Sequence, residues 1–527
     1  MQESVLLLGL LAAIVAVALV AKRFSLPYPI AFVIGGLLLA LIPDLPAVEI
    51  SPDYIFLIVL PPLLYMGGWV TDWRDFRANL RPISLLAIGL VIMTTVAVAV
   101  VTRAIFPGMG WAACFALGAI VSPPDAVAAS ATFERFSVPR RIMTVLAGEG
   151  LVNDASALVI YRFAVAAALT GTFSLTSAAL AFVLVVAGGI AVGLIVAMGI
   201  ESIMRWLTKN GMSDTLIDNV ILMVAPYAAY LPADAIHVSG VLAAVTAGVY
   251  GGYRSQIFLN PESRLMGSAV WSLLEFLFNG LIFLLIGLHL RQIVRDPSFT
   301  THTLIAGAII SVLVIVVRIA WVYSATYLPR WLSKRLAAAD PSPPWRWPFI
   351  IAWSGMRGIV SLAAALALPL TNDLGRPFPG RSPFIFITFC VILATLVFQG
   401  LTLAPIIRWL GIAGEALDLR ETEARIAALQ AALDHLRSLE RRFTTADERE
   451  IANRLRAEYE NRIAHLRGHI DGRGAIPERV RRDHWIQGEA LAAERSAIMR
   501  LRQKGEIPDE IFRRLQYDLD LAEARLR

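Results

Sequence analysis

A polar cluster in the sequence follows a pair of prolines inside an otherwise apolar stretch. The segment reads GAIVSPPDAVAASATFE, with Ser122, Pro123 and Pro124 directly ahead of Asp125. Prolines remove backbone donors and interrupt the hydrogen-bond ladder of a helix. A helix broken inside a membrane frees carbonyl oxygens, which can coordinate a cation beside a carboxylate. The segment therefore predicts a cation site; the alternative is a proline kink with Asp125 as a helix cap.

A second polar cluster occurs in AGEGLVNDASALVIY. Glu149 and Asn153 stand one helical turn apart, and Asp154 follows Asn153 on a neighbouring face. Three polar groups so close together in a spanning helix are difficult to explain by packing, because polar groups are costly there. Asp154 could hold either a proton or a cation. Competition for that one site, with access alternating between the two sides of a membrane, would suffice for exchange.

Two arginines lie in other apolar stretches. Arg318 stands alone in SVLVIVVRIAWVY, where an unpaired guanidinium is strongly unfavourable, and Glu149 is the best candidate for its partner. Arg357 lies in IIAWSGMRGIVSLAAALALP between Gly355 and Gly358, which mark a second point where a helix can open.

The elements that must position these residues are spanning helices. The chain has 527 residues, 57% of them hydrophobic and only 17% charged, which favours a bilayer as solvent. The pattern predicts an all-α membrane protein with about 13 spanning helices rather than a β-barrel of short alternating strands. The apolar runs are 4–21, 28–45, 53–70, 82–106, 110–131, 140–169, 175–203, 215–232, 236–252, 267–290, 302–326, 347–370 and 383–410.

The two interrupted runs occupy matching places. If runs one to six and eight to thirteen form two halves, each interruption falls in the fifth run of its half. Interrupted helices at corresponding positions of two inverted repeats are typical of the midplane site of a secondary transporter. The sequence therefore predicts two inverted six-helix repeats, each with one broken helix.

The loop charges predict the orientation. If the N-terminus lies outside, one set of loops carries 16 basic residues and the other set carries five. The positive-inside rule then places the C-terminus in the cytoplasm. The net charge of +6 belongs to the membrane part, because residues 411–527 contain 22 basic and 22 acidic residues. We expect a transmembrane domain over 1–410, a charged helical cytoplasmic domain over 411–527, and no nucleic-acid partner.

Several motifs together resemble the sodium/proton exchanger branch of the monovalent cation–proton antiporters. They are LPPLLYMGGW, SPPDAVAASATFE, GEGLVNDAS, HVSGVLAAVTAGV, FLLIG and GMRGIVSLAAALALP, and they extend over almost the whole membrane part. The resemblance implies a homodimer in a bacterial inner membrane, without a cofactor, exchanging Na⁺ or Li⁺ for H⁺ in pH and cation homeostasis. In such a dimer, a core domain carries the site across the membrane against a dimerisation scaffold.

The resemblance also implies roles for single residues. Asp154 resembles the ion- and proton-binding aspartate with Asn153 as its partner, and Asp125 resembles the carboxylate of the unwound helix. The resemblance makes Asp154 and Asp125 the Na⁺ ligands, Glu149 and Arg318 a structural ion pair, and Arg357 the arginine of the second broken helix. It also implies electroneutral exchange, because an Asn-Asp pair is typical of the electroneutral branch.

This sequence departs from the resemblance in two places. Met66 and Gly150 stand where some relatives have a carboxylate and a serine, so two possible cation ligands are missing. These losses leave the choice between Na⁺ and K⁺ open. Glu275, Asp234 and His237 are weaker candidates, with a structural or a pH-tuning role.

Other classes of protein compete with an antiporter. A K⁺/H⁺ exchanger would share every motif, whereas a channel would need a continuous polar pore instead of polar groups at one depth. An intramembrane aspartyl protease could use Asp125 and Asp154 as its carboxylate pair. No phosphate-binding GxxxxGK[ST] loop occurs, so ion gradients must drive transport.

Overall fold

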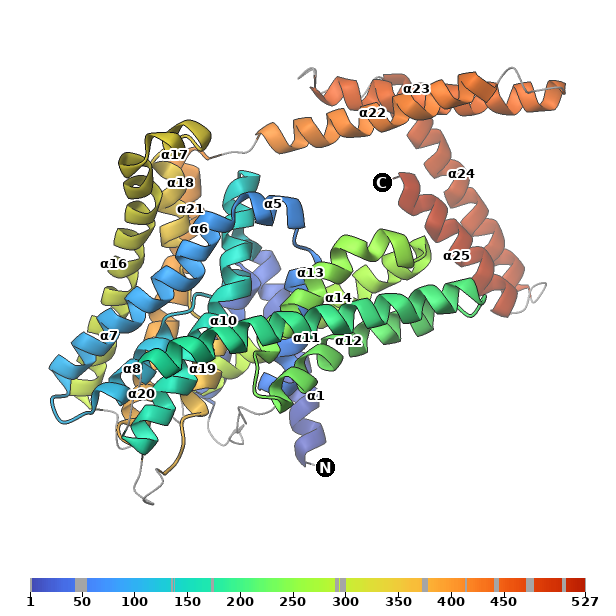
Figure 1. Ribbon diagram of the computed structural model, residues 1–527. Helices are drawn as coiled ribbons and strands as arrows, with labels where there is room; N and C mark the ends of the chain where they lie inside the picture. The colour runs from blue at the N-terminus through green and yellow to red at the C-terminus, as the bar shows by residue number, and fades with distance from the viewer. Residues whose placement is uncertain are drawn as a thin grey trace. The chain divides into compact units, whose positions relative to one another are not determined.

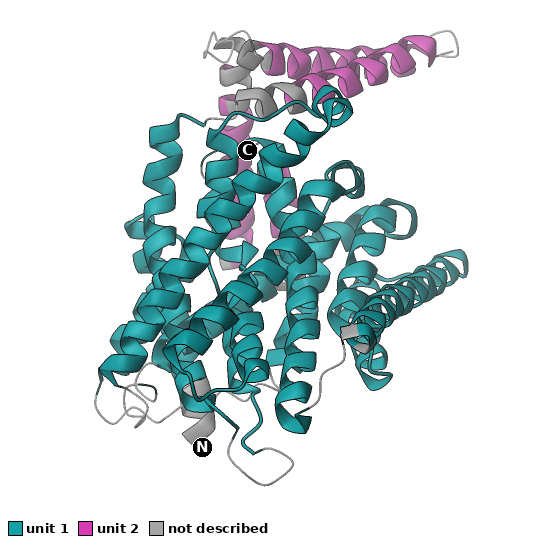
Figure 2. Ribbon diagram, turned by 60° about the vertical axis from the view of Figure 1, so that its left-hand side comes forward, with its two compact units in different colours: residues 1–413 teal, residues 414–527 magenta. Residues whose placement is uncertain are grey.

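The chain folds almost entirely into helices (Figure 1). The computed structural model describes residues 2–42, 55–133, 136, 138–171, 175–289, 293, 300–371, 378–412, 415–439, 445–470, 478–504 and 509–526. By its contacts the chain divides into two compact units, residues 1–413 and 414–527 (Figure 2). The sequence prediction had placed this boundary between residues 410 and 411.

The first unit contains the apolar helices. In chain order they are α1 (Gln2–Arg23), α2 (Tyr28–Ala40), η1 (Ile55–Val59), α4 (Leu60–Trp69), α5 (Trp73–Ala78), α6 (Leu80–Ser84), η2 (Leu85–Leu90), α7 (Val91–Ile105), α8 (Trp111–Val121), α9 (Ala126–Phe133), α10 (Arg140–Thr170), α11 (Leu175–Lys209), α12 (Thr215–Ala235), α13 (Gly240–Phe258), α14 (Pro261–Leu288), α16 (Thr301–Leu332), α17 (Lys334–Ala339), α18 (Arg346–Trp353), α19 (Ile359–Leu366), α20 (Arg381–Leu393), η3 (Ala394–Gln399) and α21 (Gly400–Leu410).

These helices confirm the predicted all-α membrane fold. Every predicted apolar run contains helix. Within the described residues, eight helical segments are long and apolar enough to cross a membrane, and α2 and the η1–α4 segment are shorter apolar helices. The predicted number of 13 spanning helices, and the relation of the halves by inversion, stay predictions. The eight long segments are Leu80–Ile105, Trp111–Ser130, Arg140–Thr170, Ala178–Lys209, Thr215–Ala235, Pro261–Leu288, Thr301–Leu332 and Arg381–Leu410.

The helices of the first unit pack in two groups. The first helix group consists of α1, α2, η1, α4 and α11–α14, and the second consists of α5–α10, η2, α16–α21 and η3. In Figure 1, α11–α14 lie to the right and α16–α21 to the left. Between the groups, α10 contacts α4, α11 and α13, α9 contacts α2, and α19 contacts α14. Packing is much denser within each group than between them, so the two groups meet along a limited contact surface.

Both predicted interruptions are present in the second helix group. The fifth run consists of α8 and α9, with residues 122–125 between them in non-helical conformation. The twelfth run consists of α18 and α19, separated by residues 354–358. Pro123 and Pro124 end the first ladder because they donate no backbone hydrogen bond. At the second break, Gly355 leaves room for the side chain of Arg318, and Gly358 leaves room for that of Asp125.

The second unit consists of four charged helices, α22 (Glu415–Leu439), α23 (Ala446–Ile470), α24 (Glu478–Gln503) and α25 (Asp509–Leu526). They pack as two pairs, α22 with α23 and α24 with α25. In the second pair, Ile498, Phe512 and Leu519 form a small buried cluster, and the Arg502 guanidinium lies 4.5 Å from the centre of the Phe512 ring. This unit therefore has its own packing apart from the apolar helices.

Candidate functional site

The two helix breaks are hydrogen-bonded to each other. The backbone N–H of Asp125 donates to the carbonyl of Met356 at 2.6 Å. In the other direction, Arg357 Nε donates to the carbonyl of Val121, the last residue of α8, at 3.2 Å. The backbone N–H of Arg357 also donates to Thr395 Oγ1 at 3.0 Å. The sequence therefore brings two unwound segments, more than two hundred residues apart, into one crossing.

Asp125 lies at the start of two half-helices. Its Oδ1 accepts a hydrogen bond from the Val127 N–H at 2.9 Å, in the first turn of α9. Its Oδ2 lies against Gly358, the residue directly before α19. A Cβ at Gly358 would lie 1.9 Å from Asp125 Oδ2, so only glycine fits there. Two helix N-termini therefore point at this carboxylate and stabilise negative charge on it.

Arg357 is fully buried within the crossing. Besides Val121, its guanidinium donates to the carbonyl of Gly355, while Nη2 has no hydrogen-bond partner among the described residues. Its charge lies at the C-terminal end of α8, where unpaired carbonyls concentrate negative potential. Arg357 thus supplies positive charge to the crossing.

Glu149 and Arg318 form a buried ion pair. Arg318 Nη1 and Nη2 lie 2.5 and 2.8 Å from the two Glu149 carboxylate oxygens, and the side chains are 0% and 1% exposed. Arg318 also donates to the carbonyls of Ile351 and Ala352 near the end of α18. A Cβ at Gly355 would lie 2.1 Å from Arg318 Cδ. The second break therefore makes room for the arginine that holds α10 and α16 to α18.

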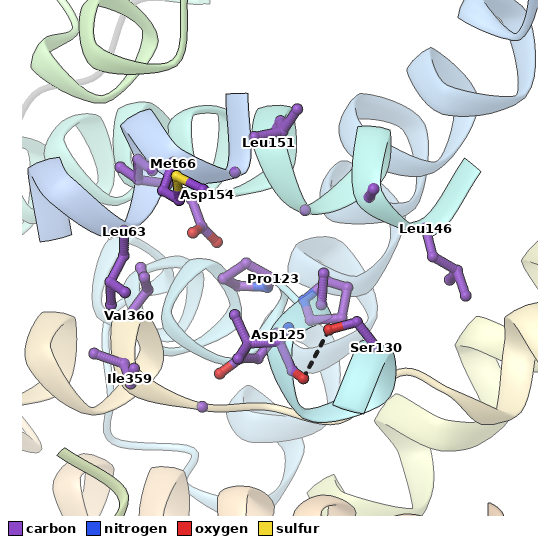
Figure 3. Close-up of a pocket in the computed structure, with 18 of the residues that line it drawn as sticks. Leu63, Met66, Pro123, Asp125, Ser130, Leu146, Leu151, Asp154, Ile359 and Val360 are labelled. Carbon is purple, nitrogen blue, oxygen red and sulfur yellow. Dashed lines mark hydrogen bonds between the residues drawn. The ribbon is translucent and has the colours of Figure 1, made fainter. Parts of the chain in front are cut away.

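Asn153 and Asp154 point in different directions from α10. Asn153 is buried, and its Nδ2 donates to the carbonyl of Pro124 at 2.7 Å, which ties α10 to the first break. The Asp154 carboxylate points into a cavity, towards Pro123 and Asp125 (Figure 3). Within the described part of the chain, Asp154 makes no hydrogen bond or ion pair through its side chain. It is therefore available for a ligand.

The cavity lies between the two helix groups. Its volume is about 430 Å³, enough for a cation with several waters. The first helix group contributes residues of α4, the following Val70, and Glu275 of α14 to its lining. The second contributes Pro123, Pro124, Asp125, Asp154 and Gly358, together with residues of α9 and α19. Its lining reaches Val70, Phe133 and Met143, close to the ends of α4 and α9 and the start of α10.

The remaining predicted residues divide into two sets. Pro123, Pro124, Gly358 and Glu275 line the cavity, whereas Ser122 is buried and donates to the carbonyl of Ala119 at 3.0 Å. His237 and Asp234 are not among the described lining residues. His237 is exposed, and Asp234 is paired with Arg162 at 2.9 Å.

The two departures from the antiporter motifs also line the cavity. Met66 presents its thioether beside Asp154 in Figure 3. A Cβ at Gly150 would lie 2.6 Å from Ala126 Cβ, so α9 and α10 approach too closely there for a larger residue.

Thr395, the hydroxyl partner of the second break, is a site residue that the sequence did not indicate. Thr395 is fully buried in η3, and its hydroxyl donates to the carbonyl of Val391 at 2.7 Å while accepting from Arg357. A hydroxyl in an apolar run was a weak signal, because threonine often bonds to its own helix. The π-helical turn that places it was not visible in the sequence.

Crossed helix breaks beside inward-pointing carboxylates, in a membrane protein of two helix groups, define a secondary transporter. Residues 9–409 match the family described as sodium/hydrogen exchanger, transmembrane. The chain belongs to this family, which confirms the family predicted from the motifs.

Relatives and solved structures agree with this assignment. The chain is 34% identical to the uncharacterized Na⁺/H⁺ exchanger YjcE of Escherichia coli, over 99% of this chain and 98% of that protein. It is 31% identical to a sodium, potassium, lithium and rubidium/H⁺ antiporter of Bacillus subtilis, over 95% of this chain and 75% of that protein. The fold is similar to that of the sodium proton antiporter MjNhaP1 from Methanocaldococcus jannaschii, with a TM-score of 0.58 and 19% identity over 78% of this chain and 99% of that one. The chain is thus a cation/proton exchanger, and the transported cation is the open question.

Proposed function

We propose that this antiporter exchanges Na⁺ for H⁺, one for one, at Asp154. The observation that carries the proposal is the Asp154 carboxylate, which points into the cavity beside the crossed breaks and has no described side-chain partner. A carboxylate in that position can bind a proton or a monovalent cation, and each excludes the other. Transport follows when the second helix group moves against the first and exposes Asp154 to the other side.

The neighbouring residues take distinct roles in this proposal. Asp125, held at two helix N-termini, contributes negative charge and a second ligand. Asn153 fixes α10 against the first break, so that Asp154 keeps its direction. Glu149 and Arg318 hold α10, α16 and α18 together as a rigid body. Arg357 balances the negative charge at the crossing.

A second candidate function is exchange of K⁺, or of several alkali cations, for H⁺. The Bacillus subtilis relative is named for sodium, potassium, lithium and rubidium. Met66 and Gly150 supply no side-chain oxygen at the cavity, and fewer fixed ligands leave more of the coordination to water. A site with few fixed ligands discriminates less by ion size.

The proposal also covers the oligomeric state, the membrane and the orientation of the protein. It works as a homodimer in a bacterial inner membrane, with residues 414–527 in the cytoplasm, and serves pH and cation homeostasis. The 16 basic residues in one set of loops support this orientation. The family is one of transporters, which argues against an aspartyl protease built from Asp125 and Asp154.

The test is cation-driven proton movement in proteoliposomes that contain a pH-sensitive dye. Na⁺, Li⁺, K⁺ and Rb⁺ are added separately to the wild type, to Asp154→Asn and to Asp518→Asn, a matched change in the second unit. We expect Na⁺ to give the largest signal, and Asp154→Asn to abolish it while Asp518→Asn keeps it. Wild-type rates in folded Asp154→Asn protein would refute the site.

A further inference from the structure

Glu275 occupies the middle of an apolar spanning helix. It lies between Leu274 and Phe276 in α14, a helix of 28 residues, and is exposed. Glu275 is the fourteenth residue after Pro261, just as Asp154 is the fourteenth after Arg140, so each lies about 21 Å along its own helix. A carboxylate at that depth is costly unless it faces water, a ligand or a polar partner. The cavity supplies that surface, because Glu275 lines it.

Glu275 also faces the cavity from the opposite wall to the two aspartates. Asp125 and Asp154 belong to the second helix group, whereas α14 packs against α1, α2 and α12 in the first. Among the described residues that line the cavity, these three carboxylates are the charged groups, and none is basic. The cavity therefore concentrates negative potential, and low-dielectric walls focus such a field on entering cations.

A polar stripe on α14 extends this surface. Ser268, Ser272, Glu275 and Asn279 recur at helical spacing on one face of an otherwise apolar helix. The two serine hydroxyls donate to carbonyls of their own helix at 2.8 Å. Asn279 Oδ1 is buried without a hydrogen-bond partner among the described residues. Such a stripe is typical of a helix face that contacts water rather than lipid.

We propose that Glu275 recruits the transported cation into the cavity, and that it does so from one side of the membrane only. Glu275 draws cations electrostatically towards Asp125 and Asp154 without ligating them there. When the second helix group moves, the two aspartates leave the α14 wall, and Glu275 no longer acts on them. The inference rests on the proposed exchange at Asp154 and adds a one-sided recruiting residue to it.

The experiment compares KM for Na⁺ and maximal rate among Glu275→Gln, Glu275→Asp and Glu262→Gln. Glu262 lies in the first turn of the same helix, is exposed, and is not among the described cavity residues, so it is a matched control for the lost charge. At low ionic strength we expect Glu275→Gln to raise KM about tenfold, with the maximal rate unchanged. Glu275→Asp and Glu262→Gln should both keep the wild-type KM.

Two further measurements separate recruitment from a structural role. Everted and right-side-out membrane vesicles present opposite faces to the medium. The higher KM of Glu275→Gln should occur only in everted vesicles, whose outer face is the one to which Val70 and Met143 lead in the proposed orientation. Raising ionic strength with N-methyl-D-glucamine chloride should raise the wild-type KM and leave that of Glu275→Gln almost unchanged, because salt screens the field of Glu275.

Each opposite outcome overturns the proposal. An unchanged KM in folded Glu275→Gln protein would mean that Glu275 recruits nothing. A loss of maximal rate in both Glu275→Gln and Glu275→Asp would mean that Glu275 takes part in the transport step or in folding. An equal change in KM from both faces of the membrane would mean that Glu275 does not act from one side only. If the wild type itself showed no cation-driven proton movement, the proposed function would fail first, so the two failures are distinguishable.

Discussion

Gly150 and Ala126 illustrate how one close approach limits the ligands of the site. Gly150 stands one turn before Asp154 on α10, where a serine hydroxyl would face the cavity. A Cβ at Gly150 would lie 2.6 Å from Ala126 Cβ, and neither backbone can yield easily because both belong to helices. As long as residue 126 is alanine, position 150 therefore has room for glycine and not for serine.

The close approach of Gly150 and Ala126 predicts the effects of a single and a double substitution. Gly150→Ser alone should push α9 away from α10 and lower both thermal stability and exchange rate, by about 1–3 kcal/mol in stability for an overpacked site. Adding Ala126→Gly should restore folding and place a hydroxyl beside Asp154. Thermal unfolding in detergent and Na⁺/K⁺ selectivity in proteoliposomes check this. A single Gly150→Ser variant as stable as wild type would contradict the steric argument.

The buried pair of Glu149 and Arg318 gives a prediction about folding. Arg318→Met leaves Glu149 buried without its partner, which costs about 3–5 kcal/mol, whereas removing both charges costs much less. Purified yield and melting temperature should therefore fall in Arg318→Met and recover in the double variant with Glu149→Gln. A double variant no better than the single one would show that the pairing does not determine stability.

At the scale of elements, Asp340 joins three helices at one end of the second helix group. It lies between α17 and α18 and pairs with Arg81 of α6, Arg141 of α10 and Arg330 of α16 at 2.9, 2.8 and 2.7 Å. Partial burial would raise the pKa of Asp340, but the hydrogen bond and charge of Arg141, with the charges of Arg330 and Arg81, hold it below its usual value.

The lowered pKa of Asp340 predicts a pH dependence. Its contribution to stability is fully present above the unfolded-state pKa of about 3.9, and is lost as pH falls through the lower folded-state value. Asp340→Asn should therefore melt at a lower temperature than wild type at neutral pH, and the difference should shrink below about pH 4. The exposed pair of Asp434 and Arg437 offers Asp434→Asn as a control with little effect. A constant difference at all pH values would contradict the charge argument.

The sequence predicted these elements unevenly. It predicted both helix breaks, because Pro-Pro-Asp and Gly-x-x-Gly are local signals. It also suggested Glu149 as the partner of Arg318, because a buried guanidinium needs a carboxylate. It could not predict that the breaks bond to each other, since Asp125 and Met356 meet only through tertiary packing. Thr395 and the position of Glu275 in the opposite wall were inaccessible for the same reason.

At the scale of the whole molecule, the two compact units predict a separable tail. The carboxylates, the breaks and the cavity all lie in residues 1–413, and residues 414–527 have their own packed helices. Deleting the chain from Arg420 should leave exchange in proteoliposomes and change its pH range or the robustness of the dimer. Complete loss of exchange in a folded truncation would show that the tail takes part in transport.

The charged residues of the site also determine the net charge that moves across the membrane in one transport cycle. Arginine side chains do not release their proton in proteins, and Arg318 binds both carboxylate oxygens of Glu149, so we assign this pair no part in proton exchange. Asp125 lies at two helix N-termini, which stabilise negative charge, and one-for-one exchange requires that its charge stays the same through the cycle. Asp154 then remains as the group that carries either one proton or one monovalent cation. The moving helix group therefore has the same charge in both directions.

Exchange should accordingly be electroneutral. In proteoliposomes with a fixed Na⁺ gradient and a voltage set by a K⁺ ionophore, the rate and the reversal point should not change with voltage. The counter-cation must be one that the protein does not transport, because a K⁺/H⁺ activity would otherwise distort the result. Electroneutral exchange requires that Asp125 keeps its charge, because a titration of Asp125 coupled to that of Asp154 would carry a second proton across the membrane in each cycle. A reversal point that shifts with voltage would establish that coupling and exclude one-for-one exchange.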